Sequence, residues 1–234
     1  MNKEIRSFVI RGSRLKDSRK ELINDNPLGL LIKNQQDNLL SFNEIFGNDN
    51  PVAIEIGFGM GDSPYYFAQN HQEYNLLAIE VHPPGVARLY WLLQEGGIKN
   101  VRIAQADCIS VLSKWIADNS LQRCSIFFPD PWPKKKHHKR RLINLNFLKL
   151  LASKLKVGAT IFIATDWSDY AYQIREVVLQ LPSLKLEAAT PDGFSTRCTD
   201  RPITAFEKKA LAKSHTIYDF AITKIATLTG EKDD

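Results

Sequence analysis

From residue 50 onward, short apolar runs alternate with segments of helical periodicity. The runs are apolar almost throughout, which is typical of parallel strands that are covered on both faces. Strands that alternate with helices in this way predict an α/β fold with right-handed crossovers. The predicted strands are 52–58, 75–81, 101–107, 124–130, 159–166, 183–189 and 216–225. The predicted helices begin near Asp62 and cover 85–94, 109–117, 146–156, 168–181 and 204–214.

A chain of 234 residues with 44% hydrophobic and 24% charged residues is long enough to bury one sizeable core. We predict a basic arm at residues 1–25, followed by a single domain at 26–234. No apolar stretch approaches the roughly 20 residues that would span a bilayer, and no secretory signal is evident. Cys108, Cys124 and Cys198 share no metal-type spacing, so we expect buried thiols and a cytoplasmic setting.

Positive charge is confined to two segments of the chain. Residues 1–20 carry a net charge of +5 and residues 134–141 carry +6, whereas the whole chain carries +5. The remainder is therefore acidic, with a net charge of −6. Two basic concentrations on an otherwise acidic body indicate a polyanionic partner such as RNA or DNA, although charge runs are often only solvated faces.

The first predicted strand ends in the turn EIGFGMGDS, with glycines at positions 57, 59 and 61. Glycine lets a ligand approach the backbone closely at a strand-to-helix turn. Glu80 ends the second predicted strand and can accept both hydroxyls of a ribose, and Asp107 ends the third, placed to meet an adenine edge. Ligands of open α/β sheets bind at these carboxyl ends, so the three features predict a nucleoside site.

The glycine turn does not match a dinucleotide-binding site, because its third glycine comes one residue earlier than in the G-x-G-x-x-G fingerprint. Glu55 and Asp62 flank the glycines, and their carboxylates would repel a pyrophosphate but suit a cation. S-adenosylmethionine (SAM) carries a sulfonium and an amino group and no phosphate. The pattern resembles the first motif of class I SAM-dependent methyltransferases.

The string FFPDPWPKKKHHKRR, residues 127–141, places Asp130 between two prolines, directly before Trp132 and a basic tract. Together with EIGFGMG, AIEVHPPGV, TDWSDYA and RPITAFE in this order, and with IRSFVIRGSRLK near the start, it resembles the tRNA (guanine-N7-)-methyltransferase family over nearly the whole chain. The resemblance implies a Rossmann-like class I methyltransferase fold, with a mostly parallel seven-stranded sheet, an antiparallel last strand and helices on both faces.

The resemblance also implies a reaction, in which the methyl group of SAM is transferred to N7 of a guanine in the variable loop of tRNA. It implies Asp130 as the catalytic residue. It implies cofactor contacts from Glu55, Gly57, Gly59, Gly61, Glu80, Asp107 and Asp130, and substrate contacts from Lys134, Asp166, Thr204 and Glu207. RNA contacts would come from Lys136, His137, His138, Lys139, Arg140 and Arg141, and no metal is implied.

Two positions depart from the family pattern. Ala205 stands where the family commonly has Lys or Arg, which indicates that a basic substrate contact is missing, and Ala78 replaces a frequent glycine. Several site residues also have structural alternatives. Asp130 alone could be a loop acid paired with lysine, and Asp166 could be a helix N-cap. Thr204 and Glu207 have the spacing of a capping box.

The chemistry expected at N7 requires no base, because N7 of guanine is an unprotonated acceptor. The enzyme must align the reactants, and the carboxylate of Asp130 can stabilise the positive charge that moves onto the purine. Trp132 offers a surface on which an extruded base could stack. Adjacent histidines among cations are poor metal ligands. A nicotinamide-dependent oxidoreductase and a non-catalytic RNA-binding protein remain as alternatives, and both a monomer and a homodimer are compatible with the sequence.

Overall fold

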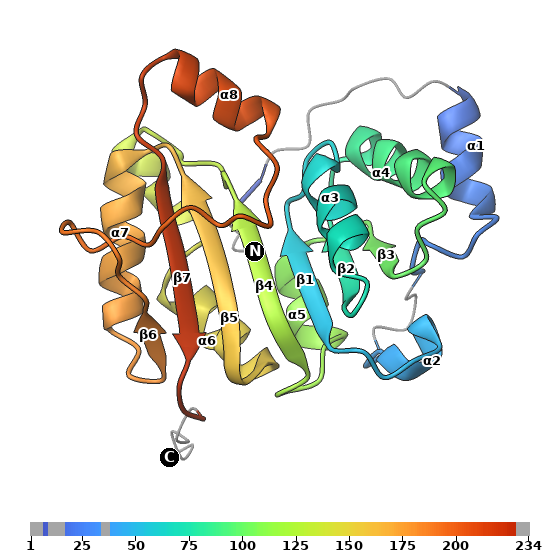
Figure 1. The fold of residues 1–234 in the computed structure, drawn as a ribbon, viewed down its shortest axis with the longest axis horizontal. Helices are drawn as coiled ribbons and strands as arrows, with labels where there is room; N and C mark the ends of the chain where they lie inside the picture. Colours follow the sequence, from blue (N-terminus) through green and yellow to red (C-terminus); the bar gives the residue numbers. More distant parts are fainter. Residues whose placement is uncertain (1–6, 9–16, 34–37, 228–234) are drawn as a thin grey trace, which may run out of the picture.

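The structure is a computed structural model that describes residues 7–8, 17–33 and 38–227. Its centre is a seven-stranded sheet with the strand order β3-β2-β1-β4-β5-β7-β6 (Figure 1). The strands are β1 (Val52–Ile56), β2 (Asn75–Ile79), β3 (Val101–Ala104), β4 (Leu121–Phe127), β5 (Leu155–Thr165), β6 (Leu184–Leu186) and β7 (Tyr218–Lys224). The helices are α1 (Asp17–Asp25), α2 (Phe42–Phe46), α3 (Asp62–Asn70), α4 (Pro83–Glu95), α5 (Cys108–Lys114), α6 (Leu145–Lys154), α7 (Ser168–Leu179) and α8 (Ala205–Ala212), with a 3-10 helix η1 (Lys135–Arg140).

Strands β1 to β5 pair in parallel, and β7 runs antiparallel to both of its neighbours, β5 and β6. The chain therefore reverses strand order between β1 and β4, where β2 and β3 lie on one side of β1 and the later strands lie on the other. This is the predicted fold class, including the antiparallel last strand, and it is confirmed. Such a reversal opens a crevice at the carboxyl ends of the central strands.

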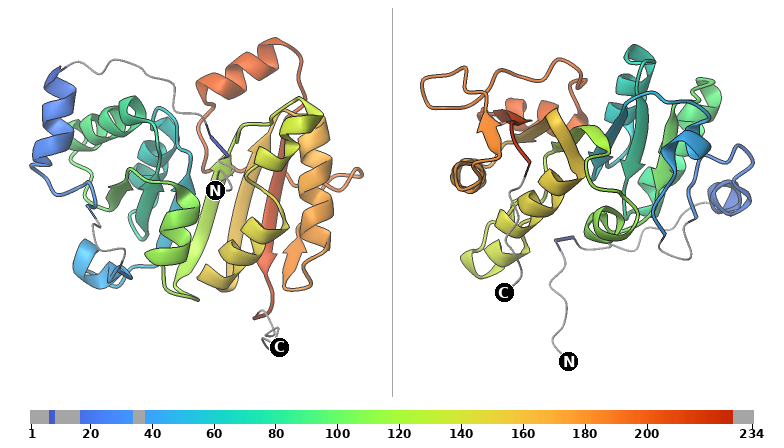
Figure 2. Two further views of the ribbon diagram at one scale, coloured as in Figure 1. Left: turned by 180° about the vertical axis from the view of Figure 1, so that it is seen from behind. Right: turned by 90° about the horizontal axis from the view of Figure 1, so that it is seen from below.

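Helices cover both faces of the sheet, as predicted (Figure 2). Alternate residues of a strand point to opposite faces, so Ala53 and Ile54 of β1 belong to different cores. Ala53 packs in the cluster that includes α3 and α4, and Ile54 packs in the cluster that includes α5, α6 and α7. Burial on both faces explains why these strands read as continuous apolar runs.

Several element boundaries differ from the sequence prediction; β4, for example, is 121–127 where 124–130 was predicted. Helix α6 ends at Lys154, and β5 begins at Leu155, which pairs with Leu121 of β4 across a register irregularity. The predicted helix ended two residues later and the predicted strand began four residues later, because Leu155 continues the apolar period of α6. Helix α5 ends at Lys114, before the buried Trp115 and Ile116. The helices α1 and α2 and the 3-10 helix η1 were not predicted.

The end of the predicted arm packs on the domain. Helix α1 lies beside α4 (Figure 1), and Leu22 and Ile23 pack against the core that α4 shares with α3. The backbone N–H of Leu28 donates to the hydroxyl of Tyr90 in α4 at 2.9 Å. Most of residues 1–16 lie outside the described part of the chain. Within the described residues, no helix combines the length and the hydropathy that crossing a bilayer would require.

Candidate active site

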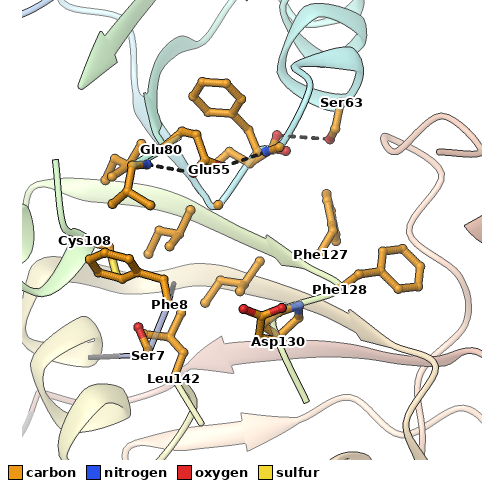
Figure 3. A pocket seen from close by; sticks show the side chains of 18 of the residues that line it. Ser7, Phe8, Glu55, Ser63, Glu80, Cys108, Phe127, Phe128, Asp130 and Leu142 are labelled. Atoms are coloured by element: carbon orange, nitrogen blue, oxygen red, sulfur yellow. Dashed lines mark hydrogen bonds between the residues drawn. The ribbon is translucent and has the colours of Figure 1, made fainter. Parts of the chain in front are cut away.

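A cavity of about 330 Å³ lies at the carboxyl ends of β1, β2, β3 and β4 (Figure 3). Figure 3 shows Glu55 and Glu80 on one side of this pocket and Asp130 on the other. Six of the residues predicted for the cofactor are thus brought together in one place, although they come from β1 and from the loops that follow β1, β2, β3 and β4. The predicted residues that line it are Glu55, Gly57, Gly59, Glu80, Asp107 and Asp130, joined by Thr204.

The glycine turn is built from left-handed backbone. Gly57, Gly59 and Gly61 have φ angles of 71°, 60° and 87°, which side chains with a Cβ rarely adopt. Gly61 does not line the pocket but begins α3 as its N-cap. A further glycine supports the turn from outside, because a Cβ on Gly85 of α4 would lie 1.9 Å from the carbonyl oxygen of Gly59. Sequence analysis missed this role, although Gly85 is visible in the string HPPGV.

The carboxylate of Glu80 links the turn after β1 to the loop after β2 through backbone hydrogen bonds. One carboxylate oxygen accepts from the backbone N–H of Gly59 at 2.9 Å, and the other accepts from those of Val81 and His82 at 2.7 and 2.9 Å. Each oxygen of an ionised carboxylate has two lone-pair sites, so three of the four sites are used and one, on the oxygen that binds Gly59, remains for a ligand hydroxyl. The carboxylate is thus held in place before a ligand arrives.

Glu55 is a buried carboxyl group at the base of the pocket. The hydroxyl of Ser63, in the first turn of α3, donates to it at 3.0 Å. Burial raises the pKa of Glu55 to about 8, and the Ser63 hydrogen bond and the positive charge of Arg123 only partly oppose that shift. At neutral pH Glu55 is therefore largely protonated in the absence of a ligand, and a cationic ligand would favour the ionised form.

Asp107 and Cys108 follow β3 at the edge of the pocket. Asp107 N-caps α5, since its side chain accepts from the backbone N–H of Ser110 at 3.1 Å. This structural role leaves its second carboxylate oxygen for a ligand. Burial raises the pKa of Cys108 to about 12, so its thiol is neutral and is not a nucleophile.

Asp130 sits on a loop that is anchored at both sides. Before it, the backbone N–H of Phe128 donates to the carbonyl of Ala164 in β5 at 2.7 Å. After it, the guanidinium of Arg141 donates to the carbonyl of Pro131 at 2.8 Å. Phe128 and Trp132 have φ angles of 54° and 46°, a strained conformation for non-glycine residues that the surrounding contacts must enforce. Asp130 itself is exposed at the mouth of the pocket.

Trp132 is already engaged in the structure. The guanidinium carbon of Arg140 lies 3.8 Å from the centre of its indole ring, and the indole N–H donates to the carbonyl of Ser7 at 3.0 Å. Arg140 also donates to the carbonyl of Phe8 at 3.2 Å. The expectation that Trp132 offers an open stacking surface is therefore wrong for the ring face that Arg140 covers. Sequence analysis gave no sign that Ser7 and Phe8 line the pocket (Figure 3).

The expected RNA contact of Arg141 does not fit its environment. The side chain is only 1% exposed, and its guanidinium binds Pro131, Gln173, His138 and Asp169. The pair with Asp169 measures 2.5 Å and holds the pKa of that carboxyl below its usual value. Arg141 thus fixes the Asp130 loop from inside the protein instead of reaching phosphate.

The other cations of the tract face outward. Lys134, Lys135, Lys136 and Lys139 are exposed on or beside η1, and His137 and His138 are half-buried. Partial desolvation, assisted by the neighbouring cations, lowers the pKa of His137, so it is neutral at pH 7. No group of three or more His, Cys, Asp or Glu side chains that could hold a metal ion occurs among the described residues.

The residues predicted for the substrate are spread around the pocket. Thr204 lines it and N-caps α8, accepting from the backbone N–H of Glu207 at 3.1 Å. The carboxylate of Glu207 does not return to Thr204 but is buried in a pair with Arg201 at 2.9 Å. Asp166 lies 3.3 Å from His215, and its alternative role as an N-cap is wrong because Trp167 occupies that position.

Arg201 is a support that sequence analysis missed. It is fully buried and forms ion pairs with Glu207 and with Asp219 of β7. Its guanidinium carbon lies 5.1 Å from the ring centre of Phe127 and 5.5 Å from that of Phe128. The C-terminal segment therefore packs against the aromatic wall of the pocket. The sequence of residues 187–203 has no apolar period from which this packing could be predicted.

The fold agrees with distant solved structures. The 16S rRNA methyltransferase KamB aligns with a TM-score of 0.54 at 13% identity, covering 79% of this chain and 93% of that protein. An SAM-dependent O-methyltransferase from Thermotoga maritima aligns with a TM-score of 0.51 at 14% identity, covering 92% and 74%. At such identities the likeness concerns the fold alone.

Sequence relatives are much closer. Residues 49–220 match the profile of a family described as "Putative methyltransferase". The tRNA (guanine-N(7)-)-methyltransferase of Vibrio cholerae serotype O1 (strain M66-2) is 40% identical over 227 residues, which cover 96% of this chain and 93% of that protein. The enzyme of the same name from Cupriavidus metallidurans is 41% identical over 223 residues, which cover 95% and 84%. The chain therefore belongs to the tRNA (guanine-N(7)-)-methyltransferase family.

Proposed function

We propose that the protein transfers the methyl group of SAM to N7 of a guanine in the variable loop of tRNA. The observation that carries this proposal is the meeting of Glu55, Glu80 and Asp130 around one pocket, beside the exposed cations of η1. The first two acids suit a cationic nucleoside, and the basic helix suits a polynucleotide. Its close relatives bear the name of this activity.

SAM occupies the pocket between the glycine turn and the loop after β4. Glu80 accepts a hydrogen bond from a ribose hydroxyl, and Asp107 meets the adenine edge. Glu55 faces the positively charged end of SAM. The cavity of about 330 Å³ lies within the range of small-molecule sites.

Methyl transfer then needs alignment more than acid–base chemistry. The lone pair of guanine N7 attacks the methyl carbon, the bond from that carbon to sulfur breaks, and S-adenosylhomocysteine leaves. No proton leaves N7 during this step. The purine becomes cationic, and the negative charge of Asp130 stabilises it. Thr204 and the exposed Lys134 contact the substrate, and Lys136 and Lys139 bind phosphates.

The three free, buried cysteines suit a reducing cytoplasmic setting.

The test is to map the methylated base. Purified protein is incubated with unmodified tRNA transcripts and SAM with a labelled methyl group, and nuclease fragments are analysed by mass spectrometry. We expect one labelled 7-methylguanine in the variable loop. A label on another atom or outside that loop would contradict the proposal, and nicotinamide-dependent oxidation without methyl transfer would favour the oxidoreductase alternative.

A first prediction concerns the ribose contacts of Glu80. Replacing Glu80 by Ala should weaken SAM binding by about 1.5–3 kcal/mol, or roughly 10- to 150-fold, because hydrogen bonds to a charged group are lost. Isothermal calorimetry measures this. Since Glu80 also holds Gly59, the control is an SAM analogue without the ribose 2′-hydroxyl. The two changes should be non-additive, and full additivity would show that Glu80 only supports the turn.

A further inference from the structure

The order of three acidic residues along the sheet indicates where the methyl acceptor lies. Asp107 follows β3, Glu80 follows β2 and Glu55 lies in β1, and the strands are neighbours in the order β3-β2-β1-β4. In the proposed complex, the adenine of SAM therefore lies over β3, its ribose over β2 and its positively charged end over β1. The next strand is β4, so the guanine that receives the methyl group meets the loop after β4, which carries Asp130.

Phe128 lies at this end of the pocket. It is the first residue after β4, two residues before Asp130, and it lines the pocket together with Thr204. Figure 3 shows its ring on the side of the pocket opposite Phe8 and Cys108, which lie at the adenine end. Phe128 is only half-buried, so part of its ring remains accessible to a ligand.

The backbone and a buried arginine hold Phe128 in place. Its backbone N–H donates to the carbonyl of Ala164 at 2.7 Å, and its φ of 54° is a strained conformation that persists only where the surroundings enforce it. The guanidinium carbon of Arg201 lies 5.5 Å from the ring centre, and ion pairs with Glu207 and Asp219 fix that guanidinium inside the protein. The ring is therefore oriented before RNA arrives, which lowers the ordering cost of binding.

An aromatic ring at this position suits the chemistry of the acceptor. A base that leaves its own stack regains stacking energy on an aromatic side chain, and proteins that bind single-stranded RNA commonly hold bases in this way. Such a contact covers a face of the purine and leaves its edges free, so N7 can still face the methyl group and the carboxylate of Asp130. Trp132, the other aromatic residue of this loop, has one ring face covered by Arg140.

We propose that Phe128 is a substrate-binding residue on whose ring the target guanine stacks during methyl transfer. The inference rests on the proposed function, because the position of the guanine follows from the binding mode of SAM. It assigns a contact to the base itself, which the cations of η1 that bind phosphates do not provide.

The first test combines a change in the protein with a change in the RNA. Binding of tRNA by the wild type and by Phe128→Leu is measured with S-adenosylhomocysteine present, once with the target guanine and once with an abasic site in its place. Leu keeps apolar volume and a Cβ but has no ring, so binding of the normal tRNA should weaken by about fivefold or more, the lower end for one base on one aromatic side chain. Binding of the abasic tRNA should not change, because the stacked partner is absent.

Two further variants separate stacking from support of the loop. Phe128→Tyr keeps the ring and should bind both RNAs as the wild type does. Phe46→Leu is the matched control, because Phe46 is also half-buried and its ring centre lies 5.1 Å from the guanidinium carbon of Arg102, but its helix α2 lies toward the amino end of β1 (Figure 1). It should leave the affinity for both RNAs unchanged, and all three variants should keep the wild-type affinity for SAM.

The second test uses the wild type alone. With 6-thioguanine at the target position, irradiation of the complex should crosslink the base to Phe128, and mass spectrometry of the peptides locates the crosslink. A crosslink confined to residues outside 127–132 would overturn the proposal, as would equal weakening of normal and abasic tRNA by Phe128→Leu or no weakening of either. If the wild type transfers no methyl group to guanine N7 of tRNA, the proposed function fails instead.

Discussion

Replacing Asp130 by Asn is expected to lower the rate of methyl transfer by about 10²–10³-fold at saturating SAM and tRNA, the range found on losing one electrostatic stabiliser. The substitution keeps the shape of the side chain and removes its charge. The loop around it is anchored by Ala164 and Arg141, through contacts to Phe128 and Pro131 that the substitution does not touch. The loss should therefore appear in kcat.

The matched control is Asp118→Asn, the same change at an exposed carboxylate in the loop between α5 and β4. Single-turnover measurements with both variants separate the chemical step from product release. A rate within twofold of the wild type for Asp130→Asn would show that the charge of Asp130 does not act on the transition state. Since no base is required, kcat of the wild type should also lack a pH dependence from deprotonation of guanine.

The second large effect concerns the pH dependence of SAM affinity. With a pKa of about 8 in the protein without SAM, Glu55 is mostly protonated at pH 7 and must lose its proton to face a cation. Affinity should therefore rise by about tenfold from pH 6 to pH 7 and level off above pH 8. Glu55→Gln keeps an acceptor for Ser63 but cannot ionise, so its affinity should lack this rise.

Calorimetry in two buffers of different ionisation enthalpy would detect the released proton directly. Titration of the SAM amino group is common to the wild type and Glu55→Gln, so the difference between them isolates Glu55. Equal pH profiles, or no proton release at pH 7 by the wild type, would contradict the assignment of a cation to Glu55.

The raised pKa of Glu55 also predicts how the free energy of unfolding of the protein without SAM depends on pH. Folded Glu55 holds its proton up to about pH 8, whereas the unfolded carboxyl loses it near pH 4.5. Between these values the folded state binds more protons, so the free energy of unfolding should fall as pH rises and then become constant. Chemical denaturation of Glu55→Gln should show a smaller fall over this range.

Local patterns in the sequence predicted the sheet and the positions of its carboxyl ends. Strands buried on both faces are recognisable because they are apolar throughout. Glu80 follows β2 directly, and Asp107 lies three residues after the end of β3. The glycine turn was recognisable because left-handed backbone demands glycine at fixed offsets. These features depend on residues that are close together in the chain.

Features that depend on distant partners could not be predicted. The basic tract looks uniform in sequence, yet Arg141 turns inward because Asp169 and Gln173 of α7 receive it, while Lys136 stays exposed. Glu207 has the spacing of a capping box, but Arg201 captures its carboxylate. The apolar period of α6 likewise continues into Leu155, but Leu155 pairs with Leu121 of β4 and therefore begins strand β5.

The central claim is that N7 of guanine is the nucleophile, and 7-deazaguanine tests it most directly. This base keeps the Watson–Crick edge of guanine but has carbon in place of N7. A tRNA that carries it only at the target position should bind and compete with normal tRNA yet accept no methyl group from SAM. Methyl incorporation into this tRNA at the normal rate would place the methyl group on another atom and contradict the proposed reaction.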